Sequence, residues 1–210
     1  MEHTQIVVVL DRSGSMQECR EATIRGFNEF LESQKVGPGT ARLYLAQFDD
    51  EYQFLYDRPI AEAVALNGEN YIPRGWTALL DAIGRTINEM GAILSAIPPA
   101  ERPSKILFAI VTDGLENRST EFSREKIREM VTHQQDKYGW EFIFLGANQD
   151  AVIEGEKLGV PLTHAATFGT AAPQARAAFV GLSRSTLQAR AGKSAMIDPS
   201  ARAAMAPRKP

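Results

Sequence analysis

The feature that most constrains the fold is a run of apolar residues that ends abruptly in polar ones. Ile6–Leu10 contains only isoleucine, valine and leucine, and Asp11, Ser13 and Ser15 follow it at every second position. Strands that are apolar at every position, without alternation, are typical of parallel sheets covered by helices on both faces. The stretch therefore predicts a buried strand whose polar end lies at the edge of a sheet.

Strand and helix signals alternate along the rest of the chain. Apolar spacing predicts helices at about 16–34, 78–96, 122–138, 150–158 and 173–190, and strands at about 42–48, 52–56, 106–111, 142–145 and 163–168. The acidic turn 49–51, which we expect to be solvated, predicts a hairpin and hence an antiparallel edge strand. We therefore predict an α/β fold: a doubly wound, mainly parallel β-sheet with one antiparallel edge strand and helices on both faces.

Length and composition predict one domain at 1–190 and a flexible C-terminal tail at 191–210. The chain has 210 residues, and its 44% hydrophobic content is enough for a sizeable core. The tail carries Gly, Pro and scattered basic residues without periodicity, which is typical of a flexible segment.

Charge, cysteine content and hydropathy exclude several classes of protein. A net charge of −3 does not suggest the broad basic footprint of a nucleic-acid binder. The single cysteine, Cys19, rules out an internal disulfide framework and fits a reducing compartment. No apolar stretch approaches the roughly 20 residues of a membrane helix, and we find no signal peptide. We expect a cytoplasmic protein that binds neither nucleic acid nor membrane.

Oxygen-bearing side chains follow two predicted strands and begin one predicted helix. Asp11, Ser13 and Ser15 follow the first strand, Thr77 stands at a helix start, and Asp113 ends another strand. Open parallel sheets bind ligands at the carboxyl ends of their strands. Two carboxylates and three hydroxyls suit a hard divalent cation such as Mg²⁺ or Mn²⁺, whereas zinc and copper favour Cys and His. The sequence therefore indicates an oxygen-ligated metal site.

Each of these residues also has a purely structural interpretation. Ser15 and Glu18 fit a capping box for the first long helix, and Thr77 fits the N-cap of the next one. Asp113 with Gly114 fits a plain turn. Taken singly, these interpretations compete evenly with the functional one, but the combination of all five oxygen ligands is more selective.

The motifs together resemble those of the von Willebrand factor type A (VWA) domain. "DRSGS", Asp11 to Ser15, resembles the family's Asp-x-Ser-x-Ser motif, while "GWTALLDAI" and "VTDGLEN" resemble its second and third segments. The resemblance covers about residues 4–190 and implies a Rossmann-like, doubly wound sheet. It also implies an intact metal-ion-dependent adhesion site (MIDAS), because all five matching positions are present.

The resemblance implies a role for each ligand. Ser13, Ser15 and Thr77 would contact Mg²⁺ or Mn²⁺ directly, and Asp11 and Asp113 would hold it directly or through waters. Similar domains complete the coordination with a Glu or Asp of a partner protein, which implies a protein–protein interaction module and not an enzyme. By family analogy, AAA+ ATPases and multi-protein assemblies are the first partners to test.

Three residues beside the predicted ligands are candidate partner contacts. Trp76 precedes Thr77, and Glu116 and Asn117 follow Asp113. An aromatic side chain next to an open coordination position would make a good interface anchor. Packing under the loop explains Trp76 equally well.

Two other functions remain open from the sequence. A haloacid dehalogenase-like phosphohydrolase also begins with an apolar strand and an Asp, but it normally needs a second Asp where this chain has Ser13. A metal-independent α/β scaffold protein would use its helices for interactions and leave the site empty. A P-loop or dinucleotide-binding enzyme is disfavoured, because neither glycine-rich motif follows a strand.

Overall fold

The computed structural model describes residues 3–147 and 150–207. Six strands form one sheet in the order β3-β2-β1-β4-β5-β6. Their bounds are β1 (His3–Asp11), β2 (Thr40–Phe48), β3 (Tyr52–Pro59), β4 (Lys105–Thr112), β5 (Glu141–Ala147) and β6 (Ala165–Phe168). β3 pairs with β2 antiparallel, and the other neighbouring pairs are parallel. The fold class predicted from the sequence is confirmed.

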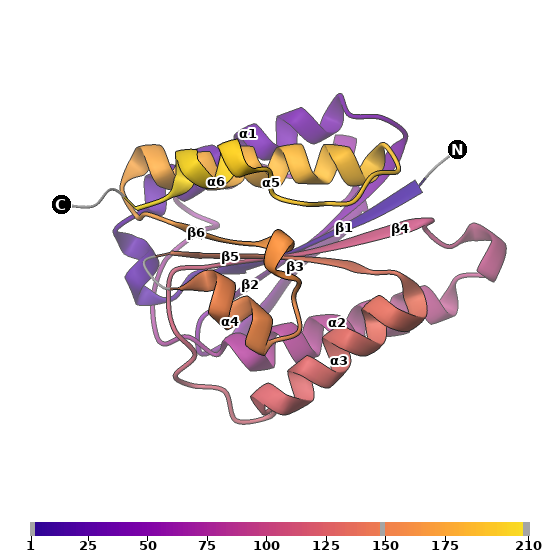
Figure 1. Ribbon diagram of the computed structural model, residues 1–210, viewed down its shortest axis with the longest axis horizontal. Helices are drawn as coiled ribbons and strands as arrows, with labels where there is room; N and C mark the ends of the chain where they lie inside the picture. Colours follow the sequence, from indigo (N-terminus) through magenta and orange to yellow (C-terminus); the bar gives the residue numbers. More distant parts are fainter. Residues whose placement is uncertain (1–2, 148–149, 208–210) are drawn as a thin grey trace.

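Helices cover both faces of the sheet (Figure 1). One face carries α1 (Arg20–Lys35), α5 (Ala172–Arg190) and α6 (Pro199–Met205), and the other carries α2 (Leu79–Ala96), α3 (Arg124–Tyr138) and α4 (Ala151–Lys157).

The two-sided cover explains the unbroken apolar run of β1. Successive side chains of a strand point to opposite faces. Ile6, Val8 and Leu10 therefore join the core that contains the apolar side chains of α1 and α5. Val7 and Val9 join the second core, beneath α2 and α3. Every position from Thr4 to Asp11 is buried, and the central run Ile6–Leu10 is apolar throughout because both of its sides face a core.

The C-terminal segment differs from the flexible tail that the sequence predicts. Residues 199–205 form α6, and Ala195, Ala201 and Met205 are buried. Gly181 of α5 leaves room for this packing, since a Cβ there would lie 2.5 Å from the Met205 side chain and 3.5 Å from Ala201. The burial depends on tertiary contacts with α5, which leave no periodic signal in so short a segment. Residues 208–210 of the predicted tail lie outside the described residues.

The same segment covers the β6 edge of the sheet. The backbone N–H of Ile197 donates to the Thr163 carbonyl at 3.0 Å, and that of Gly169 donates to the Met205 carbonyl at 3.0 Å. The Arg202 guanidinium donates to the carbonyls of Leu162 and Ala165. Covering an edge in this way removes backbone groups that another chain could pair with.

Glu141 at the start of β5 anchors the beginning of the segment. One carboxylate oxygen accepts from the Ala195 N–H at 2.6 Å and lies 3.3 Å from His164 Nε2, and the other lies 2.5 Å from Lys105 Nζ. Burial alone would raise the pKa of Glu141. The hydrogen bonds from His164, Ala195 and Lys105, together with the Lys105 charge, outweigh burial and hold that pKa at about 2.

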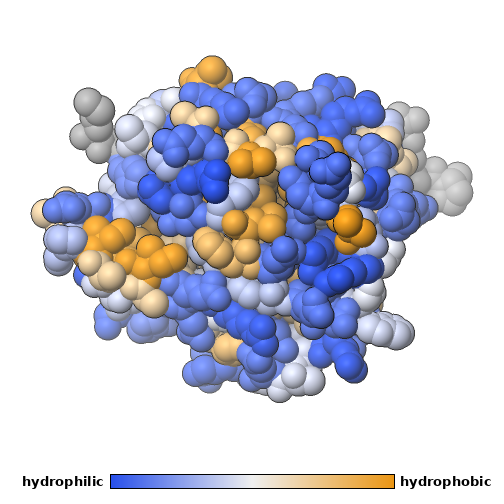
Figure 2. Space-filling model, turned by 180° about the vertical axis from the view of Figure 1, so that it is seen from behind, coloured by the Kyte–Doolittle hydropathy of each residue, from blue (hydrophilic) through white to orange (hydrophobic). Residues whose placement is uncertain are grey.

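The surface is mixed in character. Figure 2 shows one face of the protein, on which apolar side chains form separate patches among hydrophilic residues. Small exposed apolar patches are ordinary on a monomer. They point to an interaction site only where a second feature accompanies them. Among the described residues, no helix combines the length and apolar character that crossing a bilayer would require.

Substituting Glu141 with Gln tests the anchor of the C-terminal segment. A carboxyl group whose pKa is lowered on folding stabilises the protein above its unfolded pKa, near 4.5, and loses that contribution as the pH falls through about 2. We expect Glu141→Gln to reduce the free energy of unfolding at pH 7 by about 1–2 kcal/mol, a value discounted for solvent screening. Urea unfolding should show the difference from wild type shrinking between pH 4.5 and pH 2. A difference that does not vary with pH would contradict this account.

Candidate functional site

The carboxyl ends of three neighbouring strands bring the predicted ligands to one edge of the sheet. β1 lies between β2 and β4, with Asp11 opposite Phe48 of β2 and Leu10 opposite Val111 of β4. The three strands therefore end at the same level. The loops that follow them start side by side, as expected for a ligand site in an open α/β sheet.

Asp11 is fully buried and ties these loops together. One carboxylate oxygen accepts from the Ser13 backbone N–H at 2.6 Å, and the other accepts from the Thr112 hydroxyl at 2.5 Å. The Tyr71 hydroxyl donates to the Asp11 backbone carbonyl at 2.7 Å. Asp11 thus fixes the start of its own loop against the end of β4 and against the segment that leads to Thr77.

The remaining four predicted ligands lie close together. The Ser15 hydroxyl donates to Asp113 at 2.6 Å and lies 3.1 Å from the Ser13 hydroxyl. A Cβ placed on Gly114 would lie 2.8 Å from the Thr77 hydroxyl oxygen and 3.6 Å from that of Ser15. The hydroxyls of Thr77 and Ser15 therefore face the same stretch of backbone, which only glycine leaves uncrowded.

The capping interpretations of Ser15 and Thr77 are wrong. A short 3-10 turn, Gly14–Gln17, precedes α1, so the N-cap of α1 is Cys19. The N-cap of α2 is Ala78, and neither N-cap residue makes a capping hydrogen bond with its own side chain. The Ser15 hydroxyl points to Asp113 instead, so it belongs to the oxygen cluster and not to a helix end.

Two acidic groups in this cluster resist ionisation. Burial raises the pKa of Asp11 to about 7; the hydrogen bonds from Thr112 and Ser13 oppose that rise and the charge of Asp113 adds to it. Burial also raises the pKa of Asp113, against the hydrogen bond from Ser15. Two neighbouring carboxylates in a poorly solvated place favour a bound cation, because a positive charge stabilises their ionised forms.

The donor set fits a hard divalent cation. The five side chains offer only carboxylate and hydroxyl oxygens, which Mg²⁺ and Mn²⁺ accept. In the part of the chain that the structure describes, no three His, Cys, Asp or Glu residues gather in a metal-binding cluster. A metal at this edge would therefore depend on the hydroxyls of Ser13, Ser15 and Thr77 as well as on the two aspartates.

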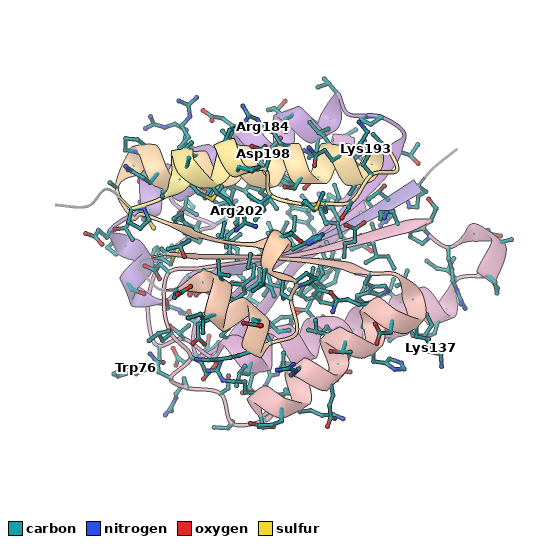
Figure 3. All side chains as sticks on the ribbon, viewed as in Figure 1. Trp76, Lys137, Arg184, Lys193, Asp198 and Arg202 are labelled. Atoms are coloured by element: carbon teal, nitrogen blue, oxygen red, sulfur yellow. The ribbon has the colours of Figure 1, made fainter. Side chains whose placement is uncertain are left out.

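Exposed apolar side chains stand beside the cluster. Trp76 is 63% exposed and Leu115 is 59% exposed. In Figure 3, Trp76 projects from the periphery of the molecule. Its backbone N–H donates to the Asp50 carboxylate at 3.2 Å, and it follows Gly75, whose φ of +65° favours glycine. The tryptophan is thus held on an ordered loop and is not packed underneath it.

The other two candidate contacts, Glu116 and Asn117, have partners within the chain. The Glu116 carboxylate accepts from the Leu80 N–H at 2.9 Å and from the backbone and hydroxyl of Ser119 at 2.7 Å each. Asn117 and Thr77 are joined twice: the Thr77 N–H donates to the Asn117 side chain at 2.9 Å, and the Asn117 N–H donates to the Thr77 carbonyl at 3.1 Å. Both residues hold the loop after β4 against the start of α2.

The sequence reasoning missed one buried acid beside the site. Asp49, expected in a solvated turn, is fully buried and pairs with Arg12 and Arg74. The solvated-turn interpretation is therefore wrong for Asp49. An acidic residue at the end of a predicted parallel strand was the available signal, but the distant arginines that compensate it leave no local pattern.

Comparisons with known proteins show the fold. No family model and no curated protein matches the chain. Among solved structures, it is similar to a pilus adhesin, SpaC from Lactobacillus rhamnosus GG (TM-score 0.64, 14% identity, 90% of this chain and 30% of that one). It is also similar to proximal thread matrix protein 1 from the mussel byssus (TM-score 0.58, 16% identity, 89% of this chain and 46% of that one). A third similar structure is a von Willebrand factor type A protein from Catenulispora acidiphila (TM-score 0.52, 14% identity, 86% of this chain and 42% of that one).

The fold is therefore VWA-like, in agreement with the resemblance of its motifs. At these identities the likeness extends to the fold alone. The chain spans less than half the length of each of these structures.

The double link between Asn117 and Thr77 yields a prediction. Asn117→Ala removes the acceptor for the Thr77 N–H, and we expect unfolding free energy to fall by about 1 kcal/mol. The amide of Thr77 should also exchange faster with deuterium. Asn117→Asp keeps an acceptor oxygen and is the matched control, with Thr77 protection close to wild type. Equal exchange of that amide in wild type and Asn117→Ala would contradict the link.

Proposed function

We propose that the protein is a protein–protein interaction module that binds a partner carboxylate through a divalent cation, Mg²⁺ or Mn²⁺, held in a MIDAS. One observation carries the proposal. Ser15 contacts both Asp113 and Ser13, and the Thr77 hydroxyl faces the same Gly114 backbone as that of Ser15. The VWA-like fold supports the proposal, because the three segments that resemble the family's motifs lie together in it.

The five side chains would have different roles at the site. The hydroxyls of Ser13, Ser15 and Thr77 would ligate the cation directly, and Asp11 and Asp113 would hold it directly or through waters. Asp11 already orients Ser13 through its backbone N–H. When bound, the cation supplies an electrophilic centre for an added carboxylate.

The partner would present Asp or Glu to the cation. AAA+ ATPases and multi-protein assemblies remain the first partners to test, in a cytoplasmic setting without nucleic acid or membrane. Trp76 and Leu115 add exposed apolar surface beside the site, so we expect the partner's acidic residue to be flanked by an apolar one.

Two alternatives are less well supported. A phosphohydrolase of the haloacid dehalogenase type would need Asp11 as a nucleophile. Both of its carboxylate oxygens accept hydrogen bonds, from Ser13 and Thr112, and the side chain is fully buried. A metal-independent scaffold protein would give no account of five converging oxygen ligands.

Titration with Mg²⁺ tests the metal site. Calorimetry should give saturable binding to wild type, and we expect at least a tenfold loss of affinity in Asp113→Ala and Ser13→Ala, because each removes an oxygen ligand. Asp11→Ala should also lose binding, with circular dichroism to check its fold. Asp136→Ala, an exposed substitution on α3, is the control. Wild-type affinity in all three site variants would rule out the assignment.

A peptide library tests the partner. Short peptides centred on Asp or Glu, with randomised flanks, should be retained by wild type in Mg²⁺ and released by EDTA. Apolar flanks should be enriched, and Trp76→Ala should reduce that enrichment severalfold. Tyr138→Ala, which removes an aromatic side chain of similar exposure at the end of α3, is the control. Retention that is insensitive to EDTA would argue against a metal-dependent partner.

A further inference from the structure

We infer that Asp49 is a positioning residue for the metal site: its buried carboxylate clamps the loop that carries Ser13 and Ser15 to the loop that carries Thr77. The inference rests on the proposed metal site and adds to it a residue outside the five ligands. Asp49 directly follows β2, at the same edge of the sheet as Asp11.

The Asp49 carboxylate joins two arginines from different loops. One oxygen lies 2.9 Å from the Arg74 Nε and 3.1 Å from the Arg12 Nε. The other oxygen accepts from the Glu51 backbone N–H at 2.7 Å. Arg12 is the second residue of the "DRSGS" motif, and Arg74 stands three residues before Thr77. A single buried anion thus holds a cation from each ligand-bearing loop.

Backbone hydrogen bonds join the same loops at the same point. The Arg74 N–H donates to the Arg12 carbonyl at 2.8 Å, and the Gly14 N–H donates to the Gly75 carbonyl at 3.2 Å. The Ala78 N–H donates to the carbonyl of Asp49 itself at 2.9 Å. Thr77 therefore lies between two backbone positions that are tied to the clamp, which fixes the place of its backbone beside the site.

Of the two arginines that pair with Asp49, Arg74 is the one whose substitution should cost little stability. Arg12 and Asp49 are both buried, so deleting Asp49 would leave Arg12 as an uncompensated buried charge, which is strongly destabilising. Deleting Arg12 would remove the buried one of the two arginines that compensate Asp49. The side chain of Arg74 is 54% exposed, so its loss leaves the Asp49–Arg12 pair intact. The pair alone would still stabilise the fold, but it would no longer hold the Thr77 loop.

Arg74→Gln separates positioning from stability. We expect three- to tenfold weaker Mg²⁺ binding by calorimetry, with a melting temperature close to wild type. Arg74→Lys, which keeps the charge, should recover part of the affinity. Glu51→Gln is the matched control: it removes the other carboxylate partner of Arg74, at 2.5 Å, and leaves Asp49 in place. Its Mg²⁺ affinity should stay within twofold of wild type.

A second readout keeps the clamp testable without the metal. The Thr77 and Ala78 amides should exchange faster with deuterium in Arg74→Gln than in wild type or Glu51→Gln. If wild type binds no Mg²⁺, the proposed function fails, and amide exchange alone decides whether the clamp exists. Unchanged exchange would overturn the clamp. Faster exchange with unchanged Mg²⁺ affinity would overturn its role in positioning the site.

Discussion

The parallel pairing of β1 with both β2 and β4 is the constraint on which the rest of the structure depends. It sets three strand ends at one level, so the loops after Asp11, Phe48 and Thr112 must begin side by side. Burying β1 from both faces requires helices on both sides, which explains its apolar sequence. Four of the five candidate ligands and Asp49 lie at or just after the ends of β1, β2 and β4, and Thr77 lies beside them just before α2.

The site has a buried layer and an exposed layer with different tasks. Asp11 and Asp49 are fully buried, and their partners are backbone N–H groups, the Thr112 hydroxyl and arginines, so they fix the loops in place. Ser15 and Trp76 lie above them and are exposed. The hydroxyls and carboxylates already contact one another, so the arrangement is preformed. A bound cation would replace hydrogen bonds such as the one from Ser15 to Asp113.

Much of the fold could be predicted from the sequence, and so could the residues that gather at the strand ends, because both depend on local patterns. The apolar runs give the strands, and Asp11, Ser13 and Ser15 form a short motif. What could not be predicted depends on contacts between distant segments. Arg74 compensates Asp49 across 25 positions, and α6 packs onto α5 through residues with no periodic pattern. Cys19, and not Ser15, is the N-cap of α1 because an extra turn intervenes.

The most direct test of the central claim is anomalous scattering from crystals grown with saturating Mn²⁺. The account predicts a strong anomalous difference peak within coordination distance of the Ser13 and Ser15 hydroxyls, with Thr77 and Asp113 around it. A clear map without a peak at that place, or with Mn²⁺ bound only elsewhere on the protein, would contradict the account.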